Sequence, residues 1–448
     1  MATSARVKEL VAQGDMLFTK RQPLLSVWQT MAENFYPNRA DFTTSHTLSD
    51  EFGGHLQTGR PLLAQRDLAN ALSSMLRPRG KPWFWARTHD EDINNDAASR
   101  EWLDLHSDQM RRLMYAPHSQ FVRAAKQGDN DFACFGQCVI QPSLNADLTG
   151  LLYRNWHLRD VVWCENSELR IDVVHRNWKL EAREMIRLFP KTVHSAVTRL
   201  VEKHPYQEIK CRHIVIPADN YDYGEGKKTN KVKFPFVSIV IDVENENILE
   251  EVPQKRLGYV IPRWVTVAGS QYAYSPSTVI ALPDARMLQA MSLTLLESGQ
   301  KAVDPPLKAT SDAIVGGVNW YAGGVTWIDK EYDEKMGAAL EPLLPPAGSA
   351  LGWGEHQITK IEQLITEAFF LNKIALPPQD VGREMTAFET KQRIEEYIRG
   401  ALPLFEPIET DYNGALCEET FHILMESGAF GSPQDMLANM PQPLQGHD

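Results

Sequence analysis

The sequence has few cysteines and no long uninterrupted apolar segment. Its five cysteines are odd in number and scattered along 448 residues (Cys134, Cys138, Cys164, Cys211 and Cys417). This distribution does not indicate a disulfide framework. No stretch of 18 or more consecutive apolar residues occurs, and the opening MATSARVKEL lacks the apolar region of a signal peptide. We therefore expect a protein that is made and kept in a cytoplasm.

Basic residues are in the minority. The chain has 46 lysines and arginines against 58 aspartates and glutamates, which gives a formal net charge of −12. Proteins that grip nucleic acid usually have a basic balance, because their cations displace counterions from the phosphates. The acidic balance therefore argues against a tight nucleic-acid binder.

Motifs for catalysis or metal binding are also missing. The 13 histidines form no HExxH pattern, no GxSxG elbow occurs, and GEGKKTN at 224–230 lacks the glycine spacing of a phosphate loop. We interpret 224–230 as a solvated hairpin turn. Cys134 and Cys138, with Cys211 and His213, are interpreted as buried residues and not as a zinc site, since no second close pair follows. We expect no cofactor, no metal and no enzymatic activity.

The apolar patterns before residue 275 predict an α+β body, and a chain of 448 residues should divide into two or more compact parts. A helix or helical pair is expected over 4–36 with a break near Gln22 and Pro23, and further helices are expected over 61–76, 97–115, 119–129 and 180–203. Alternating segments predict strands over 151–156, 161–166 and 169–178, and a buried strand over 233–244 that pairs with 258–267. The aromatic residues Trp83, Phe84 and Trp85 are predicted to pack in this body and not to stack on bases.

A helix is predicted over 276–303, and it is apolar around most of its circumference. Leu288, Met291 and Leu295 define one face, and further apolar side chains cover much of the rest. A helix of this kind must be enclosed by neighbours, which adjacent copies in a ring would supply. A charge at the Leu288 or Leu295 face is therefore expected to disrupt such a ring. Pro305 and Pro306 end the helix, and residues 307–350 suggest short strands and glycine turns.

The segment 364–408 combines a helix, a proline-containing loop and a second helix. The first helix carries apolar residues at helical spacing and stops at Pro377 and Pro378. Thr386 and Glu389 form a predicted capping box, in which the Thr hydroxyl accepts from the third amide and the Glu carboxylate reaches back. The restarted helix is expected to bend at prolines 403 and 407.

Several segments, taken in order, resemble one protein family. They are EAFF (367–370), MTAFET (385–390) with Arg393 and Glu396, LANALSSMLRPRGKPWFWAR (68–87), DFACFGQCVI (131–140), LRDVVWCENSELRIDVVHR (158–176) and PRWVTVAGSQYAYSPSTVIALPDA (262–285). The chain resembles, over roughly residues 4–430, the portal proteins or head-to-tail connectors of short-tailed, T7-like bacteriophages. GSQYAYSP at 269–276 departs from the pattern, because the family more often has a glycine and a basic residue after the tyrosine.

The resemblance implies an α+β portal fold with a definite division of the chain. It comprises a wing (1–275), a stem helix (276–303), a clip insert (304–352), a second stem helix (353–372), a channel loop (373–386), a long kinked wing helix (387–431) and a C-terminal segment (432–448) with the crown absent or shortened. Within this scheme Lys373 and Arg383 of the loop, and Arg286 and Lys301 of the first stem helix, are the expected DNA contacts of the channel. Thr386 and Glu389 are the expected structural cap.

The same resemblance implies a non-enzymatic ring, of twelve copies as in the family, at one vertex of a capsid. The ring would be a conduit for double-stranded DNA during packaging and ejection. Its implied partners are further copies of itself, the large terminase subunit, a tail adaptor, and capsid and scaffolding proteins. It would reside in the virion and, during assembly, in the host cytoplasm. Two alternatives stay open: a nucleic-acid-processing enzyme with an unrecognised carboxylate site, or another ring-shaped tail adaptor.

Overall fold

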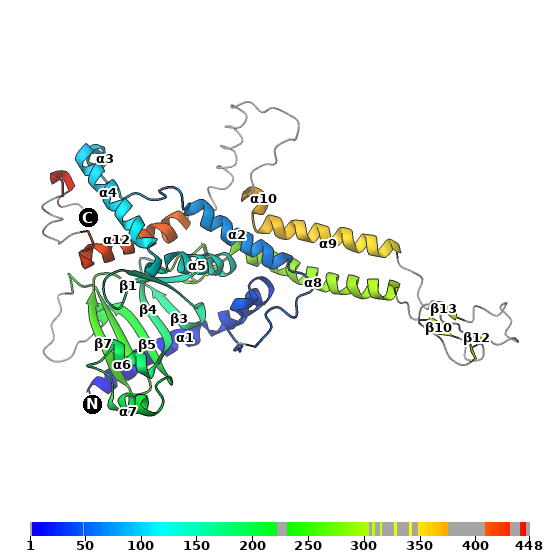
Figure 1. Cartoon of the computed structure of the whole chain (residues 1–448), viewed down its shortest axis with the longest axis horizontal. Coiled ribbons are helices and arrows are strands. Elements are labelled where there is room, and N and C mark those ends of the chain that lie inside the picture. Colours follow the sequence, from blue (N-terminus) through cyan, green and yellow to red (C-terminus); the bar gives the residue numbers. More distant parts are fainter. Residues whose placement is uncertain are drawn as a thin grey trace.

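The computed structural model consists of an α+β body and a long two-helix hairpin that projects from it (Figure 1). It describes residues 2–47, 49–221, 231–303, 307–309, 314–315, 327–328, 340–342, 348–374, 408–430 and 440–444. The main helices are α1 (Ala2–Phe35), α2 (Arg60–Leu76), α4 (Ala97–Met114), α5 (Phe121–Phe135), α8 (Pro276–Val303), α9 (Gly348–Ala368) and α12 (Ala415–Ser427). Shorter helices are α3 (Glu91–Asn95), α6 (Ala182–Leu188), α7 (Ser195–Lys203) and α10 (Leu371–Ile374).

The body is built around a five-stranded antiparallel sheet in the order β3-β4-β5-β6-β7. The strands are β3 (Val161–Glu165), β4 (Ile171–Glu181), β5 (Glu208–Pro217), β6 (Phe236–Asp242) and β7 (Asn247–Gln254). A separate hairpin joins β1 (Val139–Leu144) to β2 (Leu151–Trp156), and β8 (Val265–Thr266) pairs with β9 (Ala273–Tyr274). The predicted pairing of 233–244 with 258–267 is wrong. β6 pairs with β5 and β7 instead, because a tight β6–β7 turn closes a much shorter loop.

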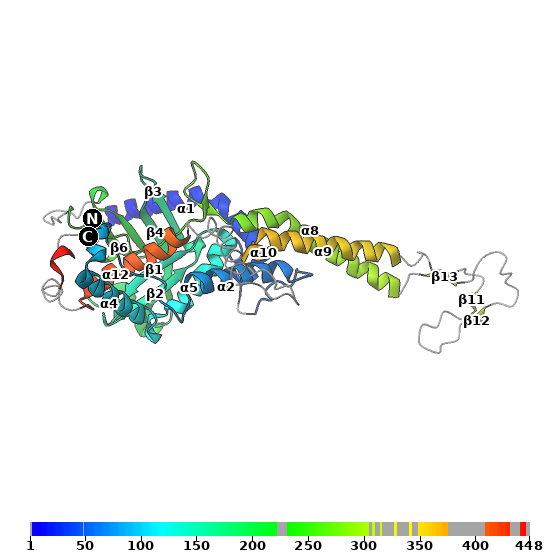
Figure 2. The ribbon, with the colours of Figure 1, turned by 90° about the horizontal axis from the view of Figure 1, so that it is seen from above.

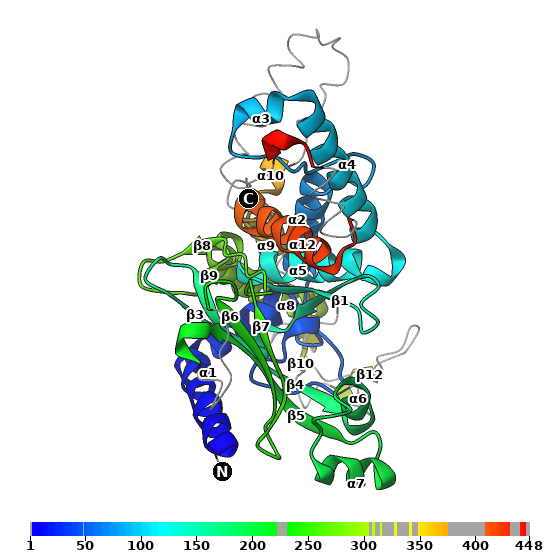
Figure 3. The same ribbon diagram turned by 90° about the vertical axis from the view of Figure 1, so that its left-hand side faces the viewer.

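Helix α1 is one 34-residue helix that continues through Pro23, so the predicted break there is wrong. It lies along one face of the sheet (Figure 3). Proline removes one backbone donor from a helix, and here tertiary contacts hold the helix on both sides of that position. Arg21 is buried and donates to the carbonyls of Leu158 and Val161, while the Trp28 side chain sits in the core at 1% exposure.

The largest core lies where α1, α2, α5, the β1–β2 hairpin and the start of α8 meet. Cys134 and Cys138 are fully buried there, and Cys211 is buried beneath α6 and α7, as predicted for thiols that act as small apolar side chains. Trp83 and Phe84 pack against this core, whereas Trp85 is 55% exposed. The prediction for the three aromatic residues is therefore confirmed for two of them.

The helical hairpin is formed by α8 and α9, which leave the body side by side (Figures 1 and 2). The bounds of α8 are those predicted. Helix α9 begins at Gly348 and ends at Ala368, so both ends lie earlier than in the predicted 353–372. It ends before residue 372 because Phe370 adopts a left-handed conformation, after which α10 begins. Beyond the hairpin, β10 (Leu307–Ala309) pairs with β13 (Leu340–Pro342), and β11 (Ile314–Val315) pairs with β12 (Trp327–Ile328). These short strands confirm the strand prediction for the described part of 307–350.

The chain re-enters the body through a π-helical segment, η6 (Glu409–Gly414), followed by α12. Helix α12 ends at Gly428, whose φ of 71° suits a helix terminus that requires a left-handed residue. The predicted helix over 387–431 is described only from residue 408 onward. Its predicted bends at prolines 403 and 407, and the turn predicted at 224–230, lie outside the described residues.

Candidate functional site

The hairpin of α8 and α9 is held together along its inner seam by small and apolar side chains. Leu288 and Ile365 are fully buried, and Ala285 is buried beside them. A Cβ added at Gly354 would lie 2.8 Å from Leu295 Cδ1, so the glycine lets the two helices approach closely. The prediction that a neighbouring copy covers this face is therefore wrong for Leu288, which is fully buried within its own subunit, whereas Leu295 is half-buried and lines an open groove.

The rest of the hairpin leaves many large apolar side chains in solvent. On α8 they are Val279 (48% exposed), Ile280 (59%), Met287 (51%), Leu293 (42%), Leu296 (56%) and Val303 (89%), and on α9 they are Trp353 (64%) and Leu364 (50%). Exposed apolar side chains that gather on one element mark interaction surfaces. The apolar helix predicted from the sequence is thus only partly enclosed within a single subunit.

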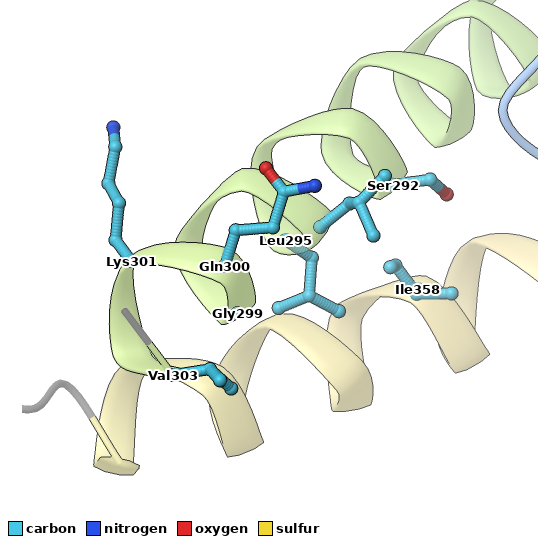
Figure 4. A pocket seen from close by; sticks show the side chains of 8 residues that line it. Ser292, Leu295, Gly299, Gln300, Lys301, Val303 and Ile358 are labelled. Atoms are coloured by element: carbon cyan, nitrogen blue, oxygen red, sulfur yellow. The ribbon is translucent and has the colours of Figure 1, made fainter. Parts of the chain in front are cut away.

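One face of the hairpin, which we call the groove face, carries an apolar groove (Figure 4). Leu296, Val303 and Ile358 contribute its apolar lining, with Leu295 and Ile358 pointing toward each other in the picture. The remaining lining residues are Ser292, Gly299, Gln300 and Lys301. The Lys301 side chain is directed away from α9 (Figure 4). The groove face is therefore apolar between the two helices and polar at its outer margin.

The body end of the same face is fixed by hydrogen bonds to residues 57–60. Gln289 Oε1 accepts from the amides of Gln57 (2.6 Å) and Thr58 (3.0 Å), and Gln289 Nε2 donates to the Thr58 carbonyl (2.9 Å). Arg60 donates to the Thr366 hydroxyl of α9 at 2.7 Å. Since both Gln289 and Thr366 reach the same short segment, they mark the groove face on α8 and α9.

The second face of the hairpin, which we call the opposite face, is also apolar. Successive residues in an α-helix are rotated by about 100°, so Ile280 and Met287 lie on the side of α8 away from Gln289. By the same rotation, Trp353 and Leu364 lie on the side of α9 away from Thr366. The four exposed side chains therefore share one face. The hairpin presents two apolar faces that point in opposite directions.

The predicted DNA contacts on α8 share a third side of the helix. Arg286 and Lys301 are exposed, and within the described residues neither takes part in a salt bridge. They are 15 positions apart, which places them within about 60° of each other around the helix and about 22 Å apart along it. Glu297 is exposed on the same side. This side points away from α9.

The other predicted site residues lie at or beyond the limit of the described residues. Lys373 falls within α10, so a helix occupies the first two positions of the predicted loop 373–386, but its side chain is not among those described. Arg383, Thr386 and Glu389 also lie outside the described residues.

Buried residues anchor the chain just before α10 and again within η6, and sequence reasoning missed the polar ones at η6. Phe369 is fully buried against Phe35, with ring centroids 5.4 Å apart, just before α10. At the other end, Arg77 pairs with Asp129 and donates to Asn413 Oδ1 at 3.2 Å. Arg77 is 336 positions from Asn413, and no local pattern signals such a contact.

In the part of the body that the structure describes, the titratable groups do not assemble a recognisable catalytic centre. Among the described residues, no group of three or more His, Cys, Asp or Glu side chains could hold a metal ion. Burial raises the pKa of the Cys134 and Cys138 thiols well above the usual value, so they stay protonated. Burial, with Arg176 nearby, lowers the pKa of His213, and its ring bonds to the Tyr259 and Ser238 hydroxyls. These buried groups therefore pack and form hydrogen bonds in the interior of the body.

Glu419 is the one described carboxyl whose pKa is raised to about 7, and burial is the main cause. Its carboxylate neighbours on α12, Glu418 and Glu426, are exposed and pair with Arg256 and Lys255. A pair of carboxylates for acid/base chemistry needs an enclosing pocket, but the two carboxylates beside the buried Glu419 lie in solvent, each in an ion pair.

Comparison with known proteins identifies the family. The sequence matches the family described as bacteriophage head to tail connecting protein over residues 7–445. It is 22% identical to a probable portal protein of Bordetella phage BPP-1 over 454 aligned residues, covering 100% of this chain and 78% of that protein. It is 21% identical to a portal protein of Salmonella phage epsilon15, covering 98% and 78%. The chain therefore belongs to the bacteriophage head to tail connecting protein family, whose members are structural portal proteins of the virion.

Proposed function

We propose that the protein assembles into a closed ring of twelve copies that forms the DNA conduit at one capsid vertex. The observation that carries this proposal is the pair of apolar faces on the α8–α9 hairpin. A ring requires each subunit to offer two different, complementary surfaces, since a two-fold contact would stop at a dimer. The groove face and the opposite face meet this requirement. The opposite face of one copy, with Trp353 and Met287, covers the groove face of the next.

A lipid bilayer is the alternative environment that could cover the exposed apolar side chains of α8. An 18-residue window of this helix reaches a mean hydropathy of 1.2 with only 17% of it buried, enough by length and composition to span a bilayer. However, α8 is packed along α9, and α9 exposes Glu355, Lys360 and Glu367. Inserting the hairpin would carry these charges into hydrocarbon at a cost of several kcal/mol. Copies of the chain cover α8 without that cost.

The proposed division of the chain is the one that the resemblance to portal proteins implies. In this division residues 1–275 serve as the wing, 276–303 and 353–372 as the stem, 304–352 as the clip, 373–386 as the channel loop, 387–431 as the wing helix and 432–448 as a C-terminal segment. The clip, at the far end of the hairpin, is the surface for the large terminase subunit during packaging and for the tail adaptor afterwards. The wing meets capsid and scaffolding proteins, and the ring assembles in the host cytoplasm.

DNA contact is assigned to the channel loop and the far side of α8. Lys373 and Arg383 are its expected phosphate contacts in the loop, with Arg286 and Lys301 on the stem. Each phosphate contact adds a step of about one unit to the salt dependence of DNA binding. Neutralising both Lys373 and Arg383 is expected to leave rings intact and to change DNA retention in a salt-dependent way. Normal packaging and retention at every ionic strength would remove these two residues from the conduit.

Electron microscopy of the purified protein tests the ring directly. Rings with a central hole, together with a native mass of about twelve subunits, are the expected result. A monomer with metal-dependent nuclease activity would instead favour the enzyme alternative. A ring that binds tail proteins but not the terminase would favour a tail adaptor.

A further inference from the structure

The face of the five-stranded sheet that points away from α1 carries a buried arginine, Arg176 of β4. Successive side chains of a strand point to opposite faces of the sheet. His175 lies on the face that α1 covers, because a Cβ at Gly14 of α1 would be 2.7 Å from its Nδ1. Arg176 and Trp178 therefore lie on the other face. Figure 3 shows α1 on one side of the sheet and β1 and α6 on the other.

The hydrogen-bonded network that begins at Arg176 carries no negative charge. Arg176 Nε donates to the Tyr259 hydroxyl at 2.9 Å, and that hydroxyl bonds His213 Nδ1. His213 Nε2 in turn bonds the Ser238 hydroxyl at 2.8 Å. Burial raises the pKa of Tyr259 and, with Arg176 nearby, lowers the pKa of His213. Both rings therefore stay neutral, so the network holds the guanidinium in place without balancing its charge.

Two tryptophan rings enclose the guanidinium. Its carbon atom lies 3.7 Å from the ring centroid of Trp156 on β2 and 4.8 Å from that of Trp178. Trp156 is held by a bond from its Nε1 to Gln141 Oε1 at 2.9 Å. Aromatic faces attract cations, but the buried Nη1 of Arg176 has no acceptor among the described residues. Arg176 is only 4% exposed, and it forms no ion pair within the described part of the chain. A buried guanidinium is thus left with donors for an anion.

A second arginine lies beside this tryptophan. Arg154 is two positions before Trp156 on β2, so the two side chains share one face of the β1–β2 hairpin. Partial burial, and then repulsion by the charge of Arg176, lower the pKa of Arg154. Its side chain still reaches solvent, and it too has no ion pair among the residues that the structure describes. Two like charges therefore meet here without an acid, in a chain where acids outnumber bases by 58 to 46. The name tryptophan–arginine site is used below for Arg154, Trp156, Arg176 and Trp178.

We propose that the tryptophan–arginine site binds a carboxylate, supplied by an aspartate or glutamate side chain of the neighbouring copy in the ring. The inference rests on the proposed function for the presence of that neighbour. A planar guanidinium binds both oxygens of a carboxylate, and the two tryptophans hold the Arg176 guanidinium in one plane. Because Arg176 is recessed, a single projecting side chain can approach it, whereas the wide phosphate backbone of duplex DNA would reach only Arg154. In a closed ring each copy turns different sides toward its two neighbours, so the α1 side of one copy can meet this site on the next.

Zero-length cross-linking identifies the occupant. Arg154→Lys keeps the positive charge and supplies an amine, which a carbodiimide joins to a carboxylate in direct contact. Rings are assembled from a mixture of isotopically light and heavy chains, so a product of one light and one heavy peptide reports a bond between copies. The control is Arg123→Lys on α5, because Arg123 is likewise exposed and has no ion pair among the described residues. Helix α5 packs on the other face of β2, where Phe121 contacts Tyr153.

We expect mixed light–heavy products at position 154 to exceed those at position 123 by about tenfold or more, because charge-assisted bonds hold the carboxylate there. Adding Arg176→Met to Arg154→Lys should lower the yield at position 154 by a similar factor. In intact rings, products confined to one copy, or no excess over the control, would overturn the inference, and so would an unchanged yield after Arg176→Met. If the double variant does not fold, the comparison of Arg154→Lys with its control decides alone. Absence of rings in electron micrographs would reject the proposed function and this inference with it, whereas intact rings without mixed products reject this inference only.

Discussion

Two substitutions on one helix separate the subunit's own core from the contact between copies. Leu288 on α8 is fully buried within its subunit, whereas Ile280 on the opposite face is 59% exposed. Leu288→Ala removes buried methyl groups and is expected to cost about 2–5 kcal/mol of folding free energy. Ile280→Glu should leave the isolated subunit almost unchanged, since a surface substitution is usually worth no more than about 0.5 kcal/mol.

The effect of Ile280→Glu is expected in the ring. Covering the exposed part of this side chain contributes about 1–2 kcal/mol per contact. A glutamate there would place an unpaired carboxylate in an apolar interface, which costs several kcal/mol at every contact around the ring. Sedimentation velocity should therefore show ring loss for Ile280→Glu with an unchanged far-ultraviolet circular dichroism spectrum. Leu288→Ala should instead lower the thermal midpoint of the subunit.

Leu105→Glu is the matched control, because Leu105 is 58% exposed on α4, away from the hairpin. It should preserve both ring and midpoint. Intact rings in Ile280→Glu at micromolar concentration would refute the claim that neighbouring copies cover the opposite face.

Two further predictions concern the body. Gly136 has a φ of 73°, and a Cβ there would lie 2.2 Å from the Tyr274 carbonyl carbon. Gly269 has a similar φ of 86°, but nothing lies within 4 Å of a Cβ built there. Gly136→Ala should therefore lower the thermal midpoint of unfolding much more than Gly269→Ala does. Burial, and then the nearby Arg212, lower the pKa of His175 to about 4 in the folded protein. As the pH falls, this imidazole is therefore protonated in the unfolded chain before it is protonated in the folded protein. The free energy of unfolding should fall as the pH drops from about 6.5 toward 4. His175→Asn should remove about 2 kcal/mol of the difference in unfolding free energy between pH 7 and pH 5, measured by urea titration, and an unchanged difference would show that His175 is not the titrating group.

Features set by a few neighbouring residues could be predicted from the sequence. The bounds of α8 follow from a proline at its first position and prolines after its last. The short strands between α8 and α9 follow from glycine-rich turn patterns. Both depend on local backbone chemistry, so they hold whatever surrounds them.

Features set by distant partners could not be predicted. The pattern Leu288, Met291, Leu295 identifies a helix face, but it does not say whether the same subunit or another one covers it. Pro23 would end an isolated helix, yet contacts from Arg21 to the β2–β3 connection hold α1 together through it. The cluster of Arg77 and Asp129 joins residues 52 positions apart, and an isolated arginine in sequence carries no sign of such burial.

The charges on α8 indicate which side of the hairpin would face the channel of the proposed ring. If the groove face and the opposite face both contact neighbouring copies, only the outer sides of α8 and α9 stay free, and one of them must line the conduit. The outer side of α8 carries Arg286, Glu297 and Lys301, a net positive charge, and few other charges. Among the described residues of α9, Glu355, Lys360 and Glu367 are exposed and carry a net negative charge, and helical rotation places Lys360 and Glu367 within about 60° of Trp353 and Leu364, toward the opposite face. Phosphates favour the first of these surfaces, and its single unit of net charge is small enough for DNA to keep moving. Within the proposed ring, we therefore expect α8 to lie on the inner wall and α9 on the outside.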